Sequence, residues 1–100
     1  MKNKVYICSP YRGDVERNLE LAREYCRLAM GEGFIPVCPH IYFTQFLCDD
    51  DEGERRMGIE AGLELLDGCS ELWVFGSPTE GMLEEIEYAR THGIGIVVKR

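Results

Sequence analysis

Glu85 is the residue of this sequence that is best placed to do chemistry. It lies in the segment from Ser77 to Ala89, SPTEGMLEEIEYA, in which a turn leads into a helical pattern. On a helix drawn at about 100° per residue, Glu85 flanks the apolar stripe of Met82, Ile86 and Ala89. A carboxylate at such a boundary can be partly desolvated and still reach a cleft, as a nucleophile or a general base requires. The same spacing also suits an ordinary solvated residue, so this alternative stays open.

Two polar turns could hold a ligand near this carboxylate. The turn from Ser9 to Asp14, SPYRGD, brings an arginine to the start of a helical pattern, and this combination suits a phosphate or a carboxylate. The second turn, Ser77-Pro78-Thr79-Glu80, fits an N-cap at Ser77, a proline at N1 and a glutamate at N3, so helix initiation alone could explain it. The first turn lacks the glycine spacing of a P-loop or of a dinucleotide fingerprint, so neither site is indicated.

Short apolar segments alternate with helical patterns along the whole chain. Strands are expected at residues 5–8, 34–38, 72–75 and 94–98, and helices at residues 14–31, 55–67 and 81–92. The strands are continuously apolar, which is typical of a parallel sheet covered on both faces. We therefore predict a single α/β domain over residues 1–100, with a three-layer doubly wound sheet of about four strands in the flavodoxin/Rossmann-like order. Residues 39–53 are predicted to be a long irregular loop whose acidic run is a solvated lid tip.

The composition excludes several classes of protein. A net charge of −7 argues against a partner that is a nucleic acid polymer, because such affinity comes from Lys and Arg. The sequence shows neither a signal peptide nor an apolar run of about 18 residues, so we expect a cytoplasmic protein with no membrane partner. Five cysteines without a C-x-x-C pair favour reduced core thiols over disulfides or zinc ligands. The acidic run lacks the spacing of a calcium loop, and no metal site is predicted.

Two helical patterns carry more apolar residues than one buried face needs. Residues 14–31 hold a first stripe of Val15, Leu19, Ala22, Cys26, Ala29 and Met30 and a second of Leu21, Tyr25 and Leu28. Residues 55–67 hold a first stripe of Ile59, Leu63 and Leu66 and a second of Met57, Ala61 and Leu65. Gly58 and Gly62 beside the latter would let another helix come close. We expect both second stripes on one side of the sheet, meeting their symmetry mates in a homodimer or a larger homo-oligomer. Ordinary exposed apolar residues are the alternative.

Two motifs resemble those of the nucleoside 2-deoxyribosyltransferase-like superfamily, which includes the deoxynucleoside 5′-monophosphate N-glycosidases and many small uncharacterised proteins. The motifs are Tyr6-Ile7-Cys8-x-x-x-Arg12-Gly13 and Thr79-x-Gly81-Met82-x-x-Glu85-x-x-x-Ala89, and the resemblance spans nearly the whole chain. It implies cleavage or exchange of the N-glycosidic bond of a nucleoside, a nucleotide or an ADP-ribose-like nucleotide. It also implies that no metal or redox cofactor takes part.

The resemblance assigns roles to individual residues by their positions in the motifs. Glu85 would be the nucleophile that attacks the anomeric carbon, and the hydroxyl of Tyr6 would orient it. Arg12 would contact a 5′-phosphate, Thr79 would bind sugar or phosphate, and His40 falls where some members place a site histidine. The other residues expected to bind the substrate are Ser9, Gly13, Ser77, Gly81 and Met82.

Two departures from the superfamily pattern favour other functions. Its members commonly carry an aspartate ahead of the third strand that assists the leaving base, and this sequence offers only Glu60, Glu64 and Asp67 there. Several active members use a C-terminal segment to complete the neighbouring subunit's site, whereas this sequence ends soon after the fourth strand. Both departures favour a nucleotide-binding or sequestering module without catalysis. The surplus apolar faces allow a structural or regulatory interaction protein as a further alternative.

Overall fold

A computed structural model describes residues 2–99 of the chain. Its strands are β1 (Lys4–Cys8), β2 (Ile35–Val37), β3 (Glu71–Phe75) and β4 (Gly95–Lys99). Its helices are α1 (Val15–Gly31), α2 (Pro39–Tyr42), the 3-10 helix η1 (Phe43–Gln45), α3 (Glu52–Asp67) and α4 (Glu80–Thr91). Each predicted strand and each predicted helix is present, with ends shifted by a few residues.

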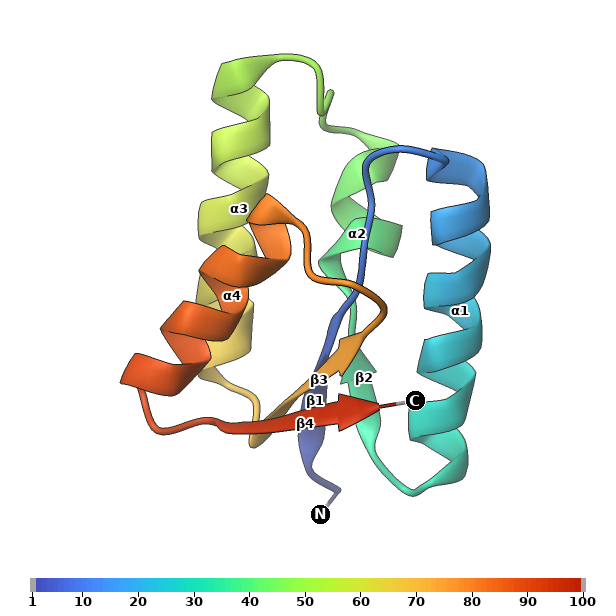
Figure 1. Cartoon of the computed structure of the whole chain (residues 1–100), viewed down its shortest axis with the longest axis vertical. Coiled ribbons are helices and arrows are strands. Elements are labelled where there is room, and N and C mark those ends of the chain that lie inside the picture. The colour runs from blue at the N-terminus through green and yellow to red at the C-terminus, as the bar shows by residue number, and fades with distance from the viewer. Residues whose placement is uncertain (1, 100) are drawn as a thin grey trace.

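The four strands form one parallel sheet in the order β2-β1-β3-β4. Tyr6 at the centre of β1 is aligned with Val37 on one side and with Leu72 on the other. This is the predicted flavodoxin-like order. Because parallel strands end at the same edge, the turns after β1 and β3 and the helix after β2 meet there, as Figure 1 shows.

Helices cover both faces of the sheet, because successive strand residues point to opposite sides. The face toward α3 and α4 is built from Tyr6, Cys8, Leu72 and Val74, with Leu66, Met82 and Ala89 from the helices. The face toward α1 is built from Val5, Ile7, Trp73 and Phe75, with Tyr25, Cys26 and Ala29 from the helix. The predicted three-layer doubly wound arrangement is therefore confirmed (Figure 1).

The position of α1 corrects the expected surface for self-association. Leu28 of α1 and Leu65 of α3 are 43% and 44% exposed, but their helices lie on opposite faces of the sheet rather than on one side. Tyr25, expected in the outer stripe, stacks on Phe75 with 3.9 Å between ring centroids. It therefore belongs to the protein's own core. A single two-fold contact cannot bury both stripes.

The buried stripe of α1 is also shorter than predicted. Ala22 and Ala29 are fully buried, whereas Val15 and Met30 are 37% and 57% exposed. The 17 residues of α1 extend for roughly 25 Å, whereas the five residues of a strand extend for roughly 16 Å. The first turn of α1 therefore projects past the sheet, and Val15 remains at the surface. Met30 follows the buried Ala29 but lies about 100° further round the helix, so it faces away from the sheet.

Each long helix begins at a side-chain cap. The carboxylate of Asp14 accepts a hydrogen bond from the backbone N–H of Arg17, and Asp51 caps α3 in the same way. Thr79 caps α4, so the prediction that Ser77 is the N-cap is wrong. The reason is that the Thr79 hydroxyl accepts from the N–H of Met82, which leaves Ser77 outside the helix.

The segment after β2 is more ordered than predicted. Instead of an irregular loop over residues 39–53, the chain forms α2 and η1, and α3 begins at Glu52. Pro39 stands at the first position of α2, where its missing N–H costs no hydrogen bond. The rings of Tyr42, Phe43 and Phe46 then pack together, with centroids 5.2–6.0 Å apart. This segment provides a wall at the carboxyl edge of the sheet.

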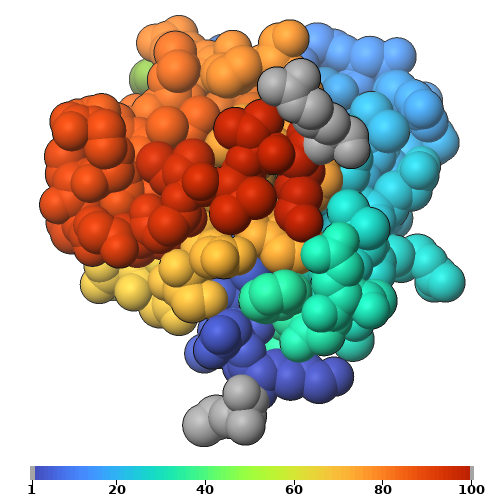
Figure 2. All heavy atoms as spheres, turned by 60° about the horizontal axis from the view of Figure 1, so that its bottom comes forward, coloured from blue at the N-terminus to red at the C-terminus, as the bar shows by residue number. Residues whose placement is uncertain are grey.

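Strand β4 forms one edge of the sheet. Figure 2 shows its residues at the surface, between α4 on one side and α1 on the other. Val98 is 62% exposed, and the ammonium group of Lys99 lies 3.8 Å from the centroid of the Trp73 ring. No helix within residues 2–99 combines the length and the apolar character needed to cross a bilayer.

All five cysteines are free thiols. Cys8 and Cys69 are buried in the core, and Cys26 and Cys38 are partly buried. Cys48 departs from the expected core position, because it is exposed beside η1.

Candidate active site

A cavity of about 160 Å³ lies at the carboxyl edge of the sheet. It adjoins β1 and β3, between which the strand order reverses, and this is the usual ligand position in open α/β sheets. Its polar walls include Tyr6, Tyr11, Arg12, His40, Thr44, Asp49, Glu54, Arg55, Thr79, Glu80 and Glu85. Its apolar walls include Pro39, Phe43, Leu47, Ile59 and Met82. The cavity thus joins apolar surface to charged groups of both signs.

Tyr6 and Glu85 form a hydrogen bond at the base of this cavity. The hydroxyl of Tyr6 donates to Oε2 of Glu85 over 2.5 Å, and Tyr6 is fixed in the core of β1. The other carboxylate oxygen, Oε1, is buried and has no hydrogen-bond partner among residues 2–99. Buried polar atoms are usually paired, so the unpaired oxygen makes Glu85, which lines the cavity, a candidate for contact with a ligand.

The environment of Glu85 sets its protonation. Burial raises the pKa of Glu85 to about 7, although the hydrogen bond from Tyr6 and the neighbouring thiol of Cys8, which donates to the carbonyl of Met82, oppose that rise. Burial, and then the neighbouring Glu85, raise the pKa of Tyr6 well above its usual range, so its hydroxyl keeps its proton. Glu85 is therefore close to half ionised at neutral pH, with a permanent donor on one oxygen.

Gly62 on α3 leaves room for this pair. A Cβ atom at residue 62 would lie 3.0 Å from the hydroxyl of Tyr6 and 3.7 Å from Pro39. Similarly, a Cβ at Gly58 would lie 3.4 Å from Leu47. The two glycines were expected to admit a helix of another subunit. They instead admit the catalytic candidate Tyr6 and the residues that wall the cavity.

His40 forms a rigid side of the cavity. Its Nε2 lies 2.8 Å from the carbonyl oxygen of Ser9, and its ring stacks on Tyr11 at a centroid distance of 5.4 Å. Because a carbonyl only accepts hydrogen bonds, Nε2 carries the proton and donates it. Burial lowers the pKa of His40 and favours the neutral ring, although the Ser9 carbonyl opposes this change. The ring thus offers a flat neutral surface.

The first turn of α4 forms part of the cavity wall. Thr79, Gly81 and Met82 all line it, and a Cβ added at Gly81 would meet no atom within 4 Å. The hydroxyl of Thr79 accepts a hydrogen bond of 3.3 Å from the N–H of Met82. An open helix start of this kind favours an anionic or strongly polar ligand group.

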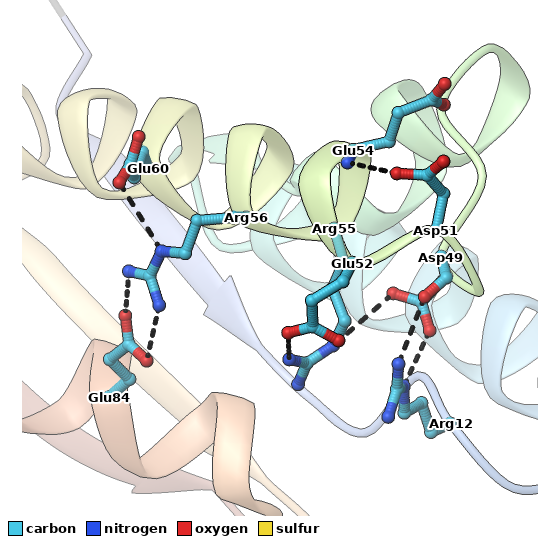
Figure 3. Close-up of polar contacts among 9 residues, drawn as sticks. All are labelled: Arg12, Asp49, Asp51, Glu52, Glu54, Arg55, Arg56, Glu60 and Glu84. Atoms are coloured by element: carbon cyan, nitrogen blue, oxygen red, sulfur yellow. Dashed lines mark hydrogen bonds and ion pairs between the residues drawn. The ribbon is translucent and has the colours of Figure 1, made fainter.

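Two arginines meet one aspartate at the outer rim of the cavity (Figure 3). The guanidinium of Arg12 donates to Oδ2 of Asp49 over 2.7 Å and to the backbone carbonyl of Asp49 over 3.0 Å. Arg55, on the first turn of α3, lies 3.9 Å from Oδ1 of the same carboxylate. Asp49 is thus not part of a solvated tip. Its bonds fasten the segment between η1 and α3 to the turn after β1.

The structure gathers most of the predicted site residues. Those that line the cavity are Tyr6, Arg12, His40, Thr79, Gly81, Met82 and Glu85. Gly13 lines a second hollow that shares Tyr11 and Arg12 with the cavity, and Ser77 is exposed outside the cavity wall. Ser9 is buried behind the wall, where its hydroxyl has no partner among residues 2–99.

The largest group that the sequence did not single out comes from the segment after β2 and from α3. Phe43, Thr44, Leu47, Asp49, Glu54, Arg55 and Ile59 line the cavity. Tyr11 also lines the cavity, although the sequence analysis named only Ser9, Arg12 and Gly13 in its turn. Periodicity could not place the segment, because its short helices leave no long pattern. Its length, however, indicated a functional loop.

None of the three acidic residues considered as an aid to the leaving base lines the cavity. Glu60, Glu64 and Asp67 are exposed on α3. The other carboxylates at the cavity wall are Asp49, Glu54 and Glu80. Of these, Glu54 accepts a hydrogen bond of 2.7 Å from the N–H of Cys48. Over residues 2–99, no three His, Cys, Asp or Glu side chains are grouped to hold a metal ion.

Comparison with solved structures shows which fold surrounds this site. The chain is similar to the 2-deoxyribosyltransferase of the psychrotolerant bacterium Bacillus psychrosaccharolyticus, with a TM-score of 0.76 and 13% sequence identity over 95% of this chain and 70% of that chain. It is also similar to the 2-deoxyribosyltransferase of Leishmania mexicana, with a TM-score of 0.66 and 18% identity. That match covers 96% of this chain and 63%, less than two thirds, of the Leishmania chain.

Comparison at the level of sequence gives a family assignment. A search of the curated proteins found no match. The model of the family described as Domain of unknown function (DUF7768) matches residues 3–99. The chain therefore belongs to the DUF7768 family, and it has a nucleoside 2-deoxyribosyltransferase-like fold.

Proposed function

We propose that this protein cleaves or exchanges the N-glycosidic bond of a nucleoside or nucleotide, including ADP-ribose-like nucleotides, with Glu85 as the nucleophile. A carboxylate oxygen of Glu85 would form a bond to the anomeric carbon while the bond from that carbon to the base breaks. The electron pair of the broken bond passes to the base, which takes up a proton from the solvent. Water or a second base then attacks the same carbon and gives up a proton to the solvent, while the bond from that carbon to Glu85 breaks and the carboxylate is released.

The observation that carries this proposal is the state of the Glu85 carboxylate. One of its oxygens accepts from Tyr6 and the other is buried without a partner at the wall of a cavity. A covalent step needs a nucleophile that is held in place and ionised in part of the molecules at working pH. A pKa of about 7, raised by burial, meets the second condition.

The remaining walls suit the parts of a nucleotide. The apolar surface of Phe43, Leu47 and Ile59 would receive the base, and the neutral His40 ring would lie beside it or beside the sugar. Arg12 and the first turn of α4 at Thr79 and Gly81 would contact the phosphate and sugar oxygens. The 2-deoxyribosyltransferase of Bacillus psychrosaccharolyticus, which has a similar fold, is described as a biocatalyst for the synthesis of nucleosides. This supports a nucleoside or nucleotide as the ligand.

The direct test is release of a free base. The purified protein is incubated with deoxynucleoside and ribonucleoside 5′-monophosphates, the matching nucleosides and ADP-ribose derivatives, and the products are separated by chromatography. A second base added to the reaction distinguishes exchange from hydrolysis. We expect base release from at least one phosphorylated substrate, and none in the Glu85→Gln variant.

A non-catalytic nucleotide-binding module is the second candidate. It is favoured because Glu60, Glu64 and Asp67 all lie outside the cavity, so the expected acid for the leaving base is missing there. Calorimetry with the same ligand panel separates the two candidates. Binding without base release in wild-type protein would support the module, whereas release of a base would exclude it.

Self-association is a separate proposal. Met57 and Leu65 on α3 are 59% and 44% exposed, and α3 also supplies a wall of the cavity. A partner subunit seated on this helix would bury both side chains and could complete the site. Leu28 on the opposite face is the alternative contact. A structural or regulatory partner other than a second copy would use the same surfaces.

A further inference from the structure

We infer that the Asp49 carboxylate occupies the position of a ligand's phosphate group, and that Arg12 and Arg55 together hold that phosphate when Asp49 is displaced. The chemical class of the ligand group is a phosphate monoester, as in a nucleoside 5′-phosphate or a sugar phosphate. The inference uses the pocket of the proposed function and rests on that proposal for the rest of the ligand.

The first observation is the way Arg12 contacts Asp49. Two separate donors of the guanidinium engage Asp49, one at the carboxylate and one at the backbone carbonyl. A phosphate oxygen could replace the carboxylate oxygen at the first donor without disturbing the second. The backbone contact would therefore keep the segment between η1 and α3 in place while the Asp49 side chain moves away.

The second observation is Arg55, which sequence analysis did not single out. Its side chain is only 21% exposed and lines the cavity. Its distances to Asp49 and Glu52 are 3.9 and 4.0 Å, which are longer than a hydrogen bond. A largely buried guanidinium whose partners lie at such distances retains N–H donors for a ligand. The planar arrangement of these donors matches phosphate oxygens.

The third observation is that the two arginines converge from different elements. Arg12 comes from the turn after β1 and Arg55 from α3, and Figure 3 shows both guanidinium groups directed at the one carboxylate of Asp49. The other acidic residues at the cavity wall include Glu54, Glu80 and Glu85. The arginine pair is therefore the positive end of a cavity that is otherwise acidic. A dianionic group would be placed at this end, away from the nucleophile.

The strengths of the competing contacts permit this exchange. Arg12 has a side-chain exposure of 55%, and water and salt screen an exposed ion pair, so the contact between Arg12 and the Asp49 carboxylate is weak. A phosphate held by two arginines gains several charge-assisted hydrogen bonds. The carboxylate of Asp49 thus acts as a weak competitor, which holds Arg12 and Arg55 in position and is displaced when a phosphate binds.

Calorimetric titration with ribose 5-phosphate tests the inference without any requirement for catalysis. Four proteins are compared: wild type, Asp49→Asn, Arg55→Ala and Arg56→Ala. Asp49→Asn removes the competing charge and keeps the shape and the backbone contact, so we expect binding about two- to fivefold tighter. Arg55→Ala should bind at least about tenfold more weakly. Arg56, the next residue on the helix, lies outside the cavity wall, so Arg56→Ala should stay within about twofold of wild type.

A gain of affinity in Asp49→Asn cannot come from a misfolded protein, so that variant keeps the inference testable even where Arg55→Ala fails to fold. Failure of the wild type to bind ribose 5-phosphate, weaker binding by Asp49→Asn, or unchanged binding by Arg55→Ala would each overturn the inference. These results are separate from the proposed function. Base release from a nucleoside 5′-phosphate that does not depend on Arg55 would leave the glycosidic chemistry standing and remove the phosphate site.

Discussion

The hydroxyl of Tyr6 and Oε2 of Glu85 lie 2.5 Å apart although 79 residues separate them in the sequence. Tyr6 is held in the core of the central strand β1, and Glu85 comes from the second turn of α4. The hydrogen bond therefore fixes the carboxylate relative to the sheet rather than to its own helix. Each change at this pair should alter both the position and the ionisation of Glu85.

Tyr6→Phe should shift the pH dependence of catalysis. The hydrogen bond from Tyr6 opposes the rise in the pKa of Glu85, so its removal moves that pKa further upward. Because the nucleophile must be ionised, the rise of kcat/KM with pH should occur at higher pH in the variant than in wild type, where it is expected near about pH 7. Rates of base release across a pH series measure the shift. A lower rate with an unmoved pH profile would show that Tyr6 does not tune Glu85.

Glu85→Gln should make the fold more stable at high pH. Burial raises the pKa of Glu85 from the ordinary 4.5 to about 7 in the folded protein. The folded state then holds this proton more tightly than the unfolded state, so the contribution of Glu85 to stability falls as pH rises from about 4.5 to about 7. Glutamine does not titrate. The unfolding free energy of the variant minus that of wild type should therefore increase by roughly 2–3 kcal/mol as the pH is raised from about 4 to about 8.

Urea denaturation at several pH values gives this difference. A difference in unfolding free energy that stays constant with pH would mean that Glu85 titrates near its ordinary value in the fold. The buried environment described for its carboxylate would then be wrong.

Gly62→Ala should damage the Tyr6–Glu85 pair. The added Cβ would lie 3.0 Å from the Tyr6 hydroxyl, which packing in the core prevents from moving freely. Overpacking of this kind costs about 1–3 kcal/mol of stability, and catalysis should fall because the hydroxyl is displaced. Thermal melting and base release measure the two effects.

Gly31→Ala is the matched control. An added Cβ at Gly31 would meet no atom within 4 Å. Gly31 is the last residue of helix α1 and is distant in the sequence from both Tyr6 and Glu85. This variant should keep full activity and the stability of wild type or slightly more. Equal effects of the two substitutions would contradict the account of why residue 62 is glycine.

Leu65→Lys and Leu28→Lys, made separately, should identify the face used for self-association. The two side chains have nearly equal exposure but lie on opposite faces of the sheet. A lysine buried against its own symmetry mate is desolvated and repelled, so the substitution at the true interface should yield a smaller species. We expect Leu65→Lys to do so. Light scattering that shows a monomeric wild type at tens of micromolar would remove the proposal.

The sequence was sufficient to predict the sheet, the order of its strands and the two residues Tyr6 and Glu85, because these depend on patterns within short segments. Val5 to Cys8 and Leu72 to Phe75 are apolar throughout, as strands buried on both faces must be. The family motifs then led to Tyr6 and Glu85, and the structure brings them together. Contacts between residues far apart in the sequence could not be predicted where no motif or periodic pattern connects the two residues.

Arg55 and Gly62 illustrate that limit. On the sequence, Arg55 is one charge among several at a helix start, and only the meeting of α3 with the turn after β1 gives it a place at the cavity. Gly62 resembles a glycine at a helix–helix contact, but Tyr6 approaches it from the sheet. The exposure of Val15 followed from the length of α1 relative to the strands, which its helical period does not encode.

Mass spectrometry of the protein quenched during turnover of a substrate identified in the base-release panel tests whether Glu85 is the nucleophile. In the wild type, we expect a sugar adduct on the peptide that contains Glu85. In Glu85→Gln, we expect no adduct, together with loss of base release to below about a tenth of wild type. An adduct on another residue, or base release in Glu85→Gln above that level, would contradict the assignment of Glu85 as the nucleophile.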